Sequence, residues 1–236
     1  MKPETVRTIS TFLLVIALSA AWPGQAQDTK APYPSMAPME QYLITNRDAE
    51  ITLARSAAPE AISRDADVLV LGTHGYENAV KGKNGFVCIV QRSWTAESTN
   101  SEFWNPKLRA PICFNPAGAR SYLPLVIKKT ELAQAGKSKE QIFAGIKAGL
   151  DKKELPLPEP GAMCYMMSKQ GYLNDRVGHW HPHLMFFVPL KDSATWGANL
   201  PDSPIIATDD PEDRLTIFMI PVGIWSDGTE DHTDMH

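Results

Sequence analysis

One segment, residues 178–189, constrains the fold of this chain more than any other. Histidine occupies every second position in its first half, and a short apolar run ending in proline follows. On a β-strand, alternate side chains lie on the same face. The pattern therefore predicts a buried strand, and one of its faces would carry His179, His181, His183, Met185 and Phe187.

The other elements follow from apolar periodicity and from cap and turn residues. Strands are expected at 67–71, 76–81, 86–92, 162–168, 181–187, 205–208 and 215–222. Helices are expected over 38–58, from Asn115 to Gly136 with a kink at Pro124, and from the capping box Ser138-x-x-Gln141. Asn84-Gly85 is a hairpin signal, so the first three strands are expected to form an antiparallel meander. This order excludes repeated βαβ units and predicts a single-domain α+β fold, a mostly antiparallel sheet of about five to seven strands with three helices packed on it.

The N-terminus has the pattern of a signal peptide. Lys2 and Arg7 precede an apolar stretch over 9–21 that is too short to span a membrane, and a small-residue cleavage site follows at Ala26. We expect residues 1–26 to be removed, residues 27–226 to form one domain and residues 227–236 to be a disordered tail. The mature chain is then expected in the periplasm or outside the cell, with no membrane span.

Charge narrows the class of partner. The formal net charge is −4, and removing Lys2, Glu4 and Arg7 with the signal peptide makes it −5. Nucleic-acid-binding proteins carry basic patches, so this mild acidity argues against nucleic acid. A small molecule or a protein remains as the expected partner.

Three cysteines follow the signal segment, and in an oxidising compartment two of them are expected to pair. Cys88 lies in a predicted strand and Cys113 in a short apolar step that can lie beside it, so Cys88–Cys113 is the favoured disulfide. The sequence permits all three pairings. If this pairing holds, Cys164 is a buried apolar side chain or, alternatively, a ligand or reactive thiol.

The histidines are candidate metal ligands. Two histidines at i and i+2 of a strand are about 6.6 Å apart at Cα, so His179 with His181, or His181 with His183, can share one ion. His74, in a glycine-bounded turn, is a candidate third ligand. Pairing of 162–168 with 181–187 would bring Met166 or Met167 near His183. Zinc or copper is the expected metal, and mixed histidine and methionine ligation favours copper.

A metal-free alternative uses the same residues. The histidines would line the mouth of a polar pocket, and tryptophans in the irregular spans would form a lid over a small molecule. Otherwise these tryptophans hold loops onto the sheet, and the methionines are simply core residues. Nucleophile-elbow, zincin and phosphate-loop motifs are missing from the sequence. The pattern therefore leaves enzymatic activity undecided.

The chain resembles a family of exported bacterial proteins of similar length. The segments that carry the resemblance are 68–77, 83–88, 111–116 and 179–187. It covers most of the mature chain, and it implies one domain without implying an activity.

Overall fold

The computed structural model describes residues 32–176, 178–179, 181–190 and 193–232. The predicted signal peptide lies outside this range, as does the end of the predicted tail, residues 233–236. The described residues belong to one compact unit, which begins at Ala31. None of the helices that the structure describes has the length and apolar character needed to cross a membrane.

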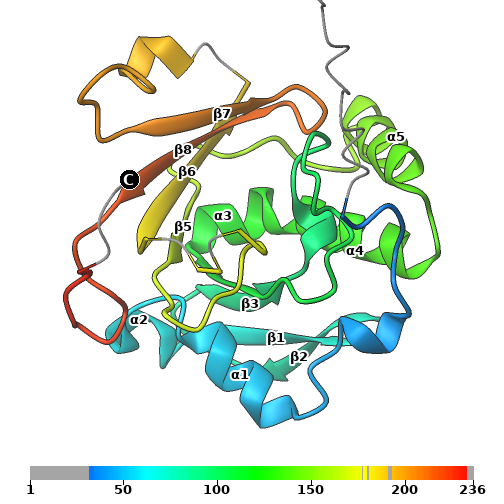
Figure 1. Cartoon of the computed structure of the whole chain (residues 1–236), viewed down its shortest axis with the longest axis horizontal. Coiled ribbons are helices and arrows are strands. Elements are labelled where there is room, and N and C mark those ends of the chain that lie inside the picture. Colours follow the sequence, from blue (N-terminus) through cyan, green and yellow to red (C-terminus); the bar gives the residue numbers. More distant parts are fainter. Residues whose placement is uncertain (1–31, 177, 180, 191–192, 233–236) are drawn as a thin grey trace, which may run out of the picture. The chain divides into compact units, whose positions relative to one another are not determined.

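A single sheet organises the described part of the chain (Figure 1). Its strands are β1 (Asp67–Gly72), β2 (Gly75–Val80), β3 (Val87–Gln91), β4 (Ala110–Phe114), β5 (Met163–Met166), β6 (His183–Pro189), β7 (Ile206–Asp210) and β8 (Leu215–Pro221). Their order across the sheet is β2-β1-β3-β4-β5-β6-β8-β7. All neighbouring pairs are antiparallel except β1 and β3, which are parallel.

Helices surround the sheet. They are α1 (Arg47–Arg55), α2 (Glu60–Ser63), α3 (Pro116–Ser121), α4 (Leu123–Gln134) and α5 (Lys139–Asp151), with short 3₁₀ turns η1 (Met39–Gln41), η2 (Ser93–Thr95) and η3 (Ser193–Trp196). The expected caps are present: Asn115 accepts the Gly118 amide, and Ser138 and Gln141 form a capping box. Pro124 stands in the first turn of α4 and not within a kinked helix, because α3 has ended at Ser121. A proline is accommodated in a first turn, where its missing N–H has no partner in any case.

The α+β class is confirmed, but the sheet differs from the prediction in two ways. Eight strands are found among the described residues, more than the expected five to seven, and the β1–β3 pair makes the sheet mixed. The predicted meander is wrong, because β3 crosses to the other side of β1. The Asn84 side chain instead joins neighbouring segments, since it donates to the Ile62 carbonyl and accepts from the Phe86 amide. A hairpin signal acts locally, whereas the choice of partner strand depends on burial over the whole sheet.

The two faces of the sheet are covered by different helices. Helices α4 and α5 pack on a core that includes Ile112, Phe114, Met185 and Phe187. On the opposite face α1 covers β1, β3 and β4 through small side chains such as Ala54. The register places His183 at the end of the face that carries α4 and α5, in the same row as Met166.

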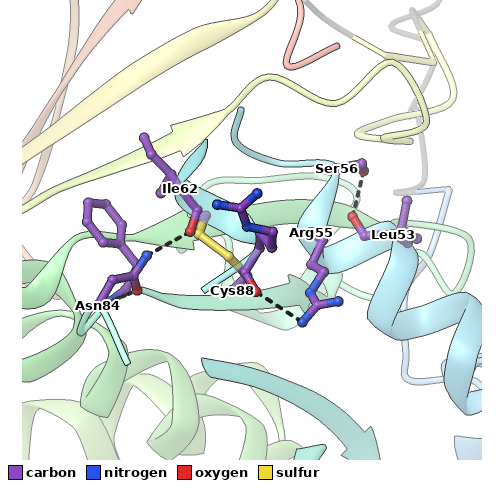
Figure 2. Close-up of a disulfide and its surroundings, with 9 residues drawn as sticks. Leu53, Arg55, Ser56, Ile62, Asn84 and Cys88 are labelled. Atoms are coloured by element: carbon purple, nitrogen blue, oxygen red, sulfur yellow. Dashed lines mark hydrogen bonds between the residues drawn. A yellow bond between two sulfur atoms is a disulfide. The ribbon is translucent and has the colours of Figure 1, made fainter. Parts of the chain in front are cut away.

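The predicted disulfide is confirmed. Cys88 and Cys113 are directly opposite on β3 and β4, and their sulfurs are bonded (Figure 2). Their Cα atoms are 4.0 Å apart, slightly below the usual range for disulfides. Cys164 is a free cysteine and is fully buried in the core between the sheet and helices α4 and α5.

The C-terminal residues differ from the expected disordered tail. Ile224 forms a bridge with Glu230, and the Asp231 amide donates to the Gly223 carbonyl at 3.0 Å. The segment therefore folds back toward the start of β6 as far as Asp231. Disorder was predicted from the acidic composition of this tail, and composition does not predict contacts of this kind.

Candidate functional site

The structure separates the predicted histidine row. His183 is the first residue of β6, and its side chain is buried, with 4% exposed. His181 precedes the strand, and its Nδ1 lies 2.6 Å from Asp231 Oδ2. His179 is exposed and lies edge-on to Trp225, with 5.8 Å between ring centroids. Each of the three rings thus has different surroundings.

His74 does not join them. It lies in the exposed turn between β1 and β2. In the strand order, β1 and β6 are four steps apart, which at about 4.8 Å a step is about 19 Å. Across residues 32–232, leaving out the undescribed positions, no group of three or more His, Cys, Asp or Glu side chains is arranged to hold a metal. The four histidines therefore do not form one shared site.

His181 and His183 each have a ring orientation set by a contact of Nδ1, with Asp231 and with a backbone carbonyl. His183 Nδ1 lies 2.7 Å from the carbonyl oxygen of His181, which can only accept, so this nitrogen carries a proton. Burial lowers the pKa of His183 below its ordinary value of 6.5, which favours the neutral ring. In the neutral ring the lone pair is on Nε2. Metal-binding histidines are commonly oriented by such a bond from the other nitrogen.

His183 faces a cavity of about 200 Å³, which we call the β6 cavity. Its floor is the sheet surface formed by Met166, His183, Met185, Ile217 and Met219. One wall is the segment that follows β3, with Arg92, Thr95 and Glu97. Asp210 and Asp213, from the end of β7 and the turn before β8, form another. Leu108, Tyr122 and Leu173 add apolar surface.

Asp213 is the most unusual group in the β6 cavity. Its side chain is 2% exposed, and its Oδ2 accepts a hydrogen bond from Lys129 Nζ at 2.6 Å. Its Oδ1 is buried and has no hydrogen-bond partner among the described residues. A buried carboxylate oxygen without a partner is unfavourable, because it has lost the water that would otherwise solvate it. One carboxylate oxygen at the β6 cavity, Asp213 Oδ1, therefore receives no hydrogen bond from the described residues.

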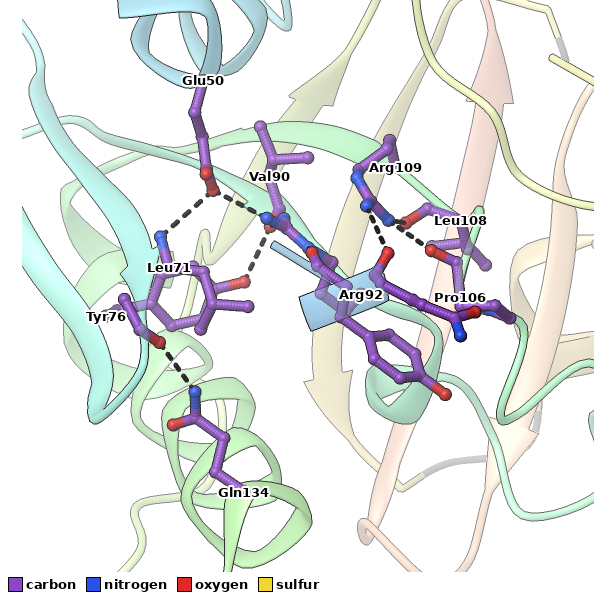
Figure 3. Close-up of polar contacts among 12 residues, drawn as sticks. Glu50, Leu71, Tyr76, Val90, Arg92, Pro106, Leu108, Arg109 and Gln134 are labelled. Carbon is purple, nitrogen blue, oxygen red and sulfur yellow. Dashed lines mark hydrogen bonds and ion pairs between the residues drawn. The ribbon is translucent and has the colours of Figure 1, made fainter. Parts of the chain in front are cut away.

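The charges around the β6 cavity leave it acidic. The Arg92 guanidinium is fully buried and pairs with Glu50 at 2.9 Å, as Figure 3 shows. Lys129 likewise forms an ion pair with Asp213. Asp210 is buried and accepts from the amides of Glu212 and Asp213, but no described cation pairs with it or with Glu97. Two carboxylates are therefore left without a cation.

None of the tryptophans that the structure describes lines the β6 cavity. Trp94 and Trp104 are buried in a separate core cluster, where Trp94 Nε1 donates to Thr130 Oγ1 at 3.0 Å. Trp196 is half-exposed and stacks on Phe218. Trp180 lies outside the described residues. Trp94 and Trp104 therefore hold their loops against a core formed mainly by α4 and α5.

A larger open groove, of about 520 Å³, runs between residues 33–36 and the start of α5. Three of its polar groups already have partners: Ser138 caps α5, Glu140 accepts from Ser138, and Lys139 lies over the Phe103 ring. The groove therefore lacks the unpaired buried charge that distinguishes the β6 cavity.

Comparison of the chain with protein-family models, with curated proteins and with solved structures found no match. The resemblance to exported bacterial proteins stays a prediction. Function must be argued from the cavity itself.

Sequence reasoning found only part of this site. The sequence singles out His183 and Met166 but not Glu97, Asp210 or Asp213. The available signal was the acidic Asp209-Asp210-Pro211-Glu212-Asp213 turn, which carries four carboxylates and lies next to an apolar strand. Such turns are common at the surface, so the burial of Asp213 could not be predicted from them.

Asp213 is expected to titrate close to pH 6. Burial raises the pKa of its carboxyl from 3.8 to about 6; Lys129 opposes the rise and Asp210 adds to it. Because this pKa is higher in the folded state than in the unfolded state, the folded protein binds more protons between about pH 4 and 6, and Asp213 makes stability fall as pH rises through that window. The Asp213→Asn variant lacks this effect, so its stability relative to the native protein should rise with pH.

Two measurements check the predicted pKa of Asp213 and its effect on stability. Carbon-13 NMR of the Asp213 carboxyl gives its pKa directly, and urea unfolding of both proteins at several pH values gives the stability difference. A carboxyl that titrates at about pH 4 or below, with a stability difference that is flat in pH, would contradict the prediction.

Proposed function

We propose that this chain is an exported protein that binds a small cation in the β6 cavity. The observation that carries the proposal is Asp213, whose buried Oδ1 lacks a partner in the described part of the chain. A cation placed beside it would supply the missing interaction. Such charge-assisted contacts are stronger than those between neutral groups.

The sign of the ligand's charge follows from the walls of the cavity. Arg92 and Lys129 are each neutralised by a buried carboxylate, Glu50 and Asp213. The carboxylates of Asp210 and Glu97 remain uncompensated by any described cation. An anion in the cavity would meet repulsion from these groups, and a neutral ligand would leave their charge unbalanced.

Export is supported by two features. The Cys88–Cys113 disulfide requires an oxidising compartment, such as the periplasm or the exterior of the cell. The predicted signal peptide over residues 1–26 gives a route to it.

A positive charge can come from a metal ion or from an organic ammonium group, so the test separates the two. Butylammonium, butanol and butyrate are similar in size and differ in charge, and Zn²⁺, Ca²⁺ and Ag⁺ represent metal ions of different softness. Isothermal titration of the mature protein, without a histidine tag, should detect binding of at least one cation and of neither butanol nor butyrate.

The Asp213→Asn variant should lower the affinity for the bound cation at least tenfold. Asp202→Asn is the matched control, since Asp202 is exposed and asparagine tolerates its left-handed backbone conformation. Thermal unfolding tests whether both variants fold. The proposal fails if no cation in the set binds, if butyrate binds better than butylammonium, or if Asp213→Asn folds and binds as the native protein does.

A further inference from the structure

We infer that the cation bound in the β6 cavity is a soft monovalent metal ion, Cu(I), held by His183 together with the thioether sulfurs of Met185 and Met219. This inference rests on the proposed function, because it names the cation of the same cavity. It draws on a different observation, the strand register of the cavity floor.

The register gathers these three side chains on one face of the sheet. Met166 of β5 is directly opposite His183 of β6, and Met185 of β6 is directly opposite Met219 of β8. Directly opposite side chains have Cβ atoms about 4.5–5.5 Å apart, and His183 and Met185 are two residues apart on one strand. All three line the β6 cavity. Met166 also lines it, but Met166 and Met219 are two strands and two residues apart, about 12 Å on a regular sheet, which is too far for both to bind one ion. Methionine has three rotatable side-chain bonds, so the sulfurs of Met185 and Met219 can turn toward one point near the imidazole.

The donor set selects the kind of metal. Thioethers are soft ligands that suit Cu(I), whereas Mg²⁺ and Ca²⁺ take oxygen ligands. Imidazole also binds copper, and the bond from His183 Nδ1 to a backbone carbonyl gives the ring the orientation common in metal-bound histidines. Cys164 lies in the same row of the sheet as Met185 but does not line the cavity.

The carboxylates that line the β6 cavity supply the negative charge that the metal-binding side chains lack. Two thioethers and a neutral imidazole carry no charge, so a bound Cu(I) would bring one uncompensated positive charge into a buried site. Buried charges need a partner of opposite sign. Asp210 and Glu97, which no described cation neutralises, line the same cavity and provide it.

Methionines at such positions can also be ordinary core residues, and the experiment separates the two roles. The mature protein, without a histidine tag, is titrated with Cu(I) under anaerobic conditions against the chromophoric chelator bicinchoninate. We expect one Cu(I) per chain. X-ray absorption at the copper edge should show sulfur neighbours together with a nitrogen neighbour.

Leucine replaces methionine with little change in volume, so Met→Leu variants keep the packing. Met185→Leu and Met219→Leu should each weaken Cu(I) binding at least tenfold, and a variant with both changes should weaken it further. His183→Gln should remove the nitrogen neighbour from the spectrum. Met167→Leu is the matched control, because Met167 is equally buried and does not line the cavity; it should bind as the native protein does.

The outcomes distinguish this inference from the proposed function. If Cu(I) and Ag⁺ do not bind but butylammonium binds and depends on Asp213, the inference is wrong and the proposed function stands. If no cation binds, both are wrong. If Cu(I) binds equally well to the Met→Leu variants and shows no sulfur neighbours, the ion is held elsewhere on the chain and the inference is overturned.

Discussion

Replacing Glu50 with glutamine is expected to lower the free energy of unfolding by about 3–5 kcal/mol. Glu50 and Arg92 form an ion pair with side chains 1% and 0% exposed. Without the carboxylate, the guanidinium is left as a buried charge that water cannot reach. The effect is large because a buried charge loses its hydration whether or not a partner is present.

The same pair positions one wall of the β6 cavity. Glu50 Oε1 accepts from the Leu71 amide at the end of β1 as well as from Arg92, and Arg92 Nε donates to the Tyr42 carbonyl at 2.6 Å (Figure 3). The pair thus ties α1, β1 and the segment after β3 to one another. We expect Glu50→Gln to weaken cation binding in the cavity as well as stability.

Denaturant unfolding of the native protein and of three variants, Glu50→Gln and the two described next, checks this prediction. A double variant with Glu50→Leu and Arg92→Met removes both charges and should recover a large part of the lost stability, since apolar residues can replace a buried ion pair. Lys147→Ala, which breaks an exposed pair with Asp151, should change stability by less than about 1 kcal/mol. A Glu50→Gln protein no less stable than Lys147→Ala would refute the argument.

Removing the Cys88–Cys113 disulfide is expected to cost about 3–4 kcal/mol. The bridge joins residues 25 positions apart, and the chain-entropy model gives this value for a loop of that length. For a domain of this size the loss corresponds to a fall in melting temperature on the order of 10 °C. A Cys88→Ala, Cys113→Ala variant suits the test, because both positions are fully buried and alanine adds no buried hydroxyl.

Calorimetry with and without reductant measures the loss. Alkylation in denaturant without reductant should modify one thiol, Cys164, since it is the free cysteine of the chain. Cys164→Ala serves as the control and should stay sensitive to reductant. Modification of all three cysteines, or a melting temperature unaffected by reductant, would show that the bridge does not form.

Local sequence patterns determined the elements. The capping box at Ser138 and the cap at Asn115 set the starts of α5 and α3 as expected. Apolar runs predicted seven of the eight described strands within a few residues, whereas β4 was expected only as a short apolar step. The expected proximity of that step to the strand of Cys88 predicted the disulfide. These features depend on neighbours within a few positions, so the sequence alone contains the information.

Tertiary structure decided how the elements are joined. The Asn84-Gly85 signal suggested a hairpin, but β3 lies between β1 and β4, where both of its faces are buried. The histidine row was predicted from strand alternation, yet the strand begins only at His183, and His181 precedes it with its ring bonded to Asp231. Local alternation holds only within a strand, and its first residue is set by pairing with β5 and β8.

Most of the candidate site depends on the tertiary structure and could not be predicted from local patterns. His183 could be selected from the sequence because histidine is rare and the pattern around it is unusual. Glu97, Asp210 and Asp213 reach the β6 cavity from segments far apart in the chain. Which side chains share a cavity depends on the order of strands across the sheet, and that order is fixed by burying both faces at once, a condition that no local pattern encodes.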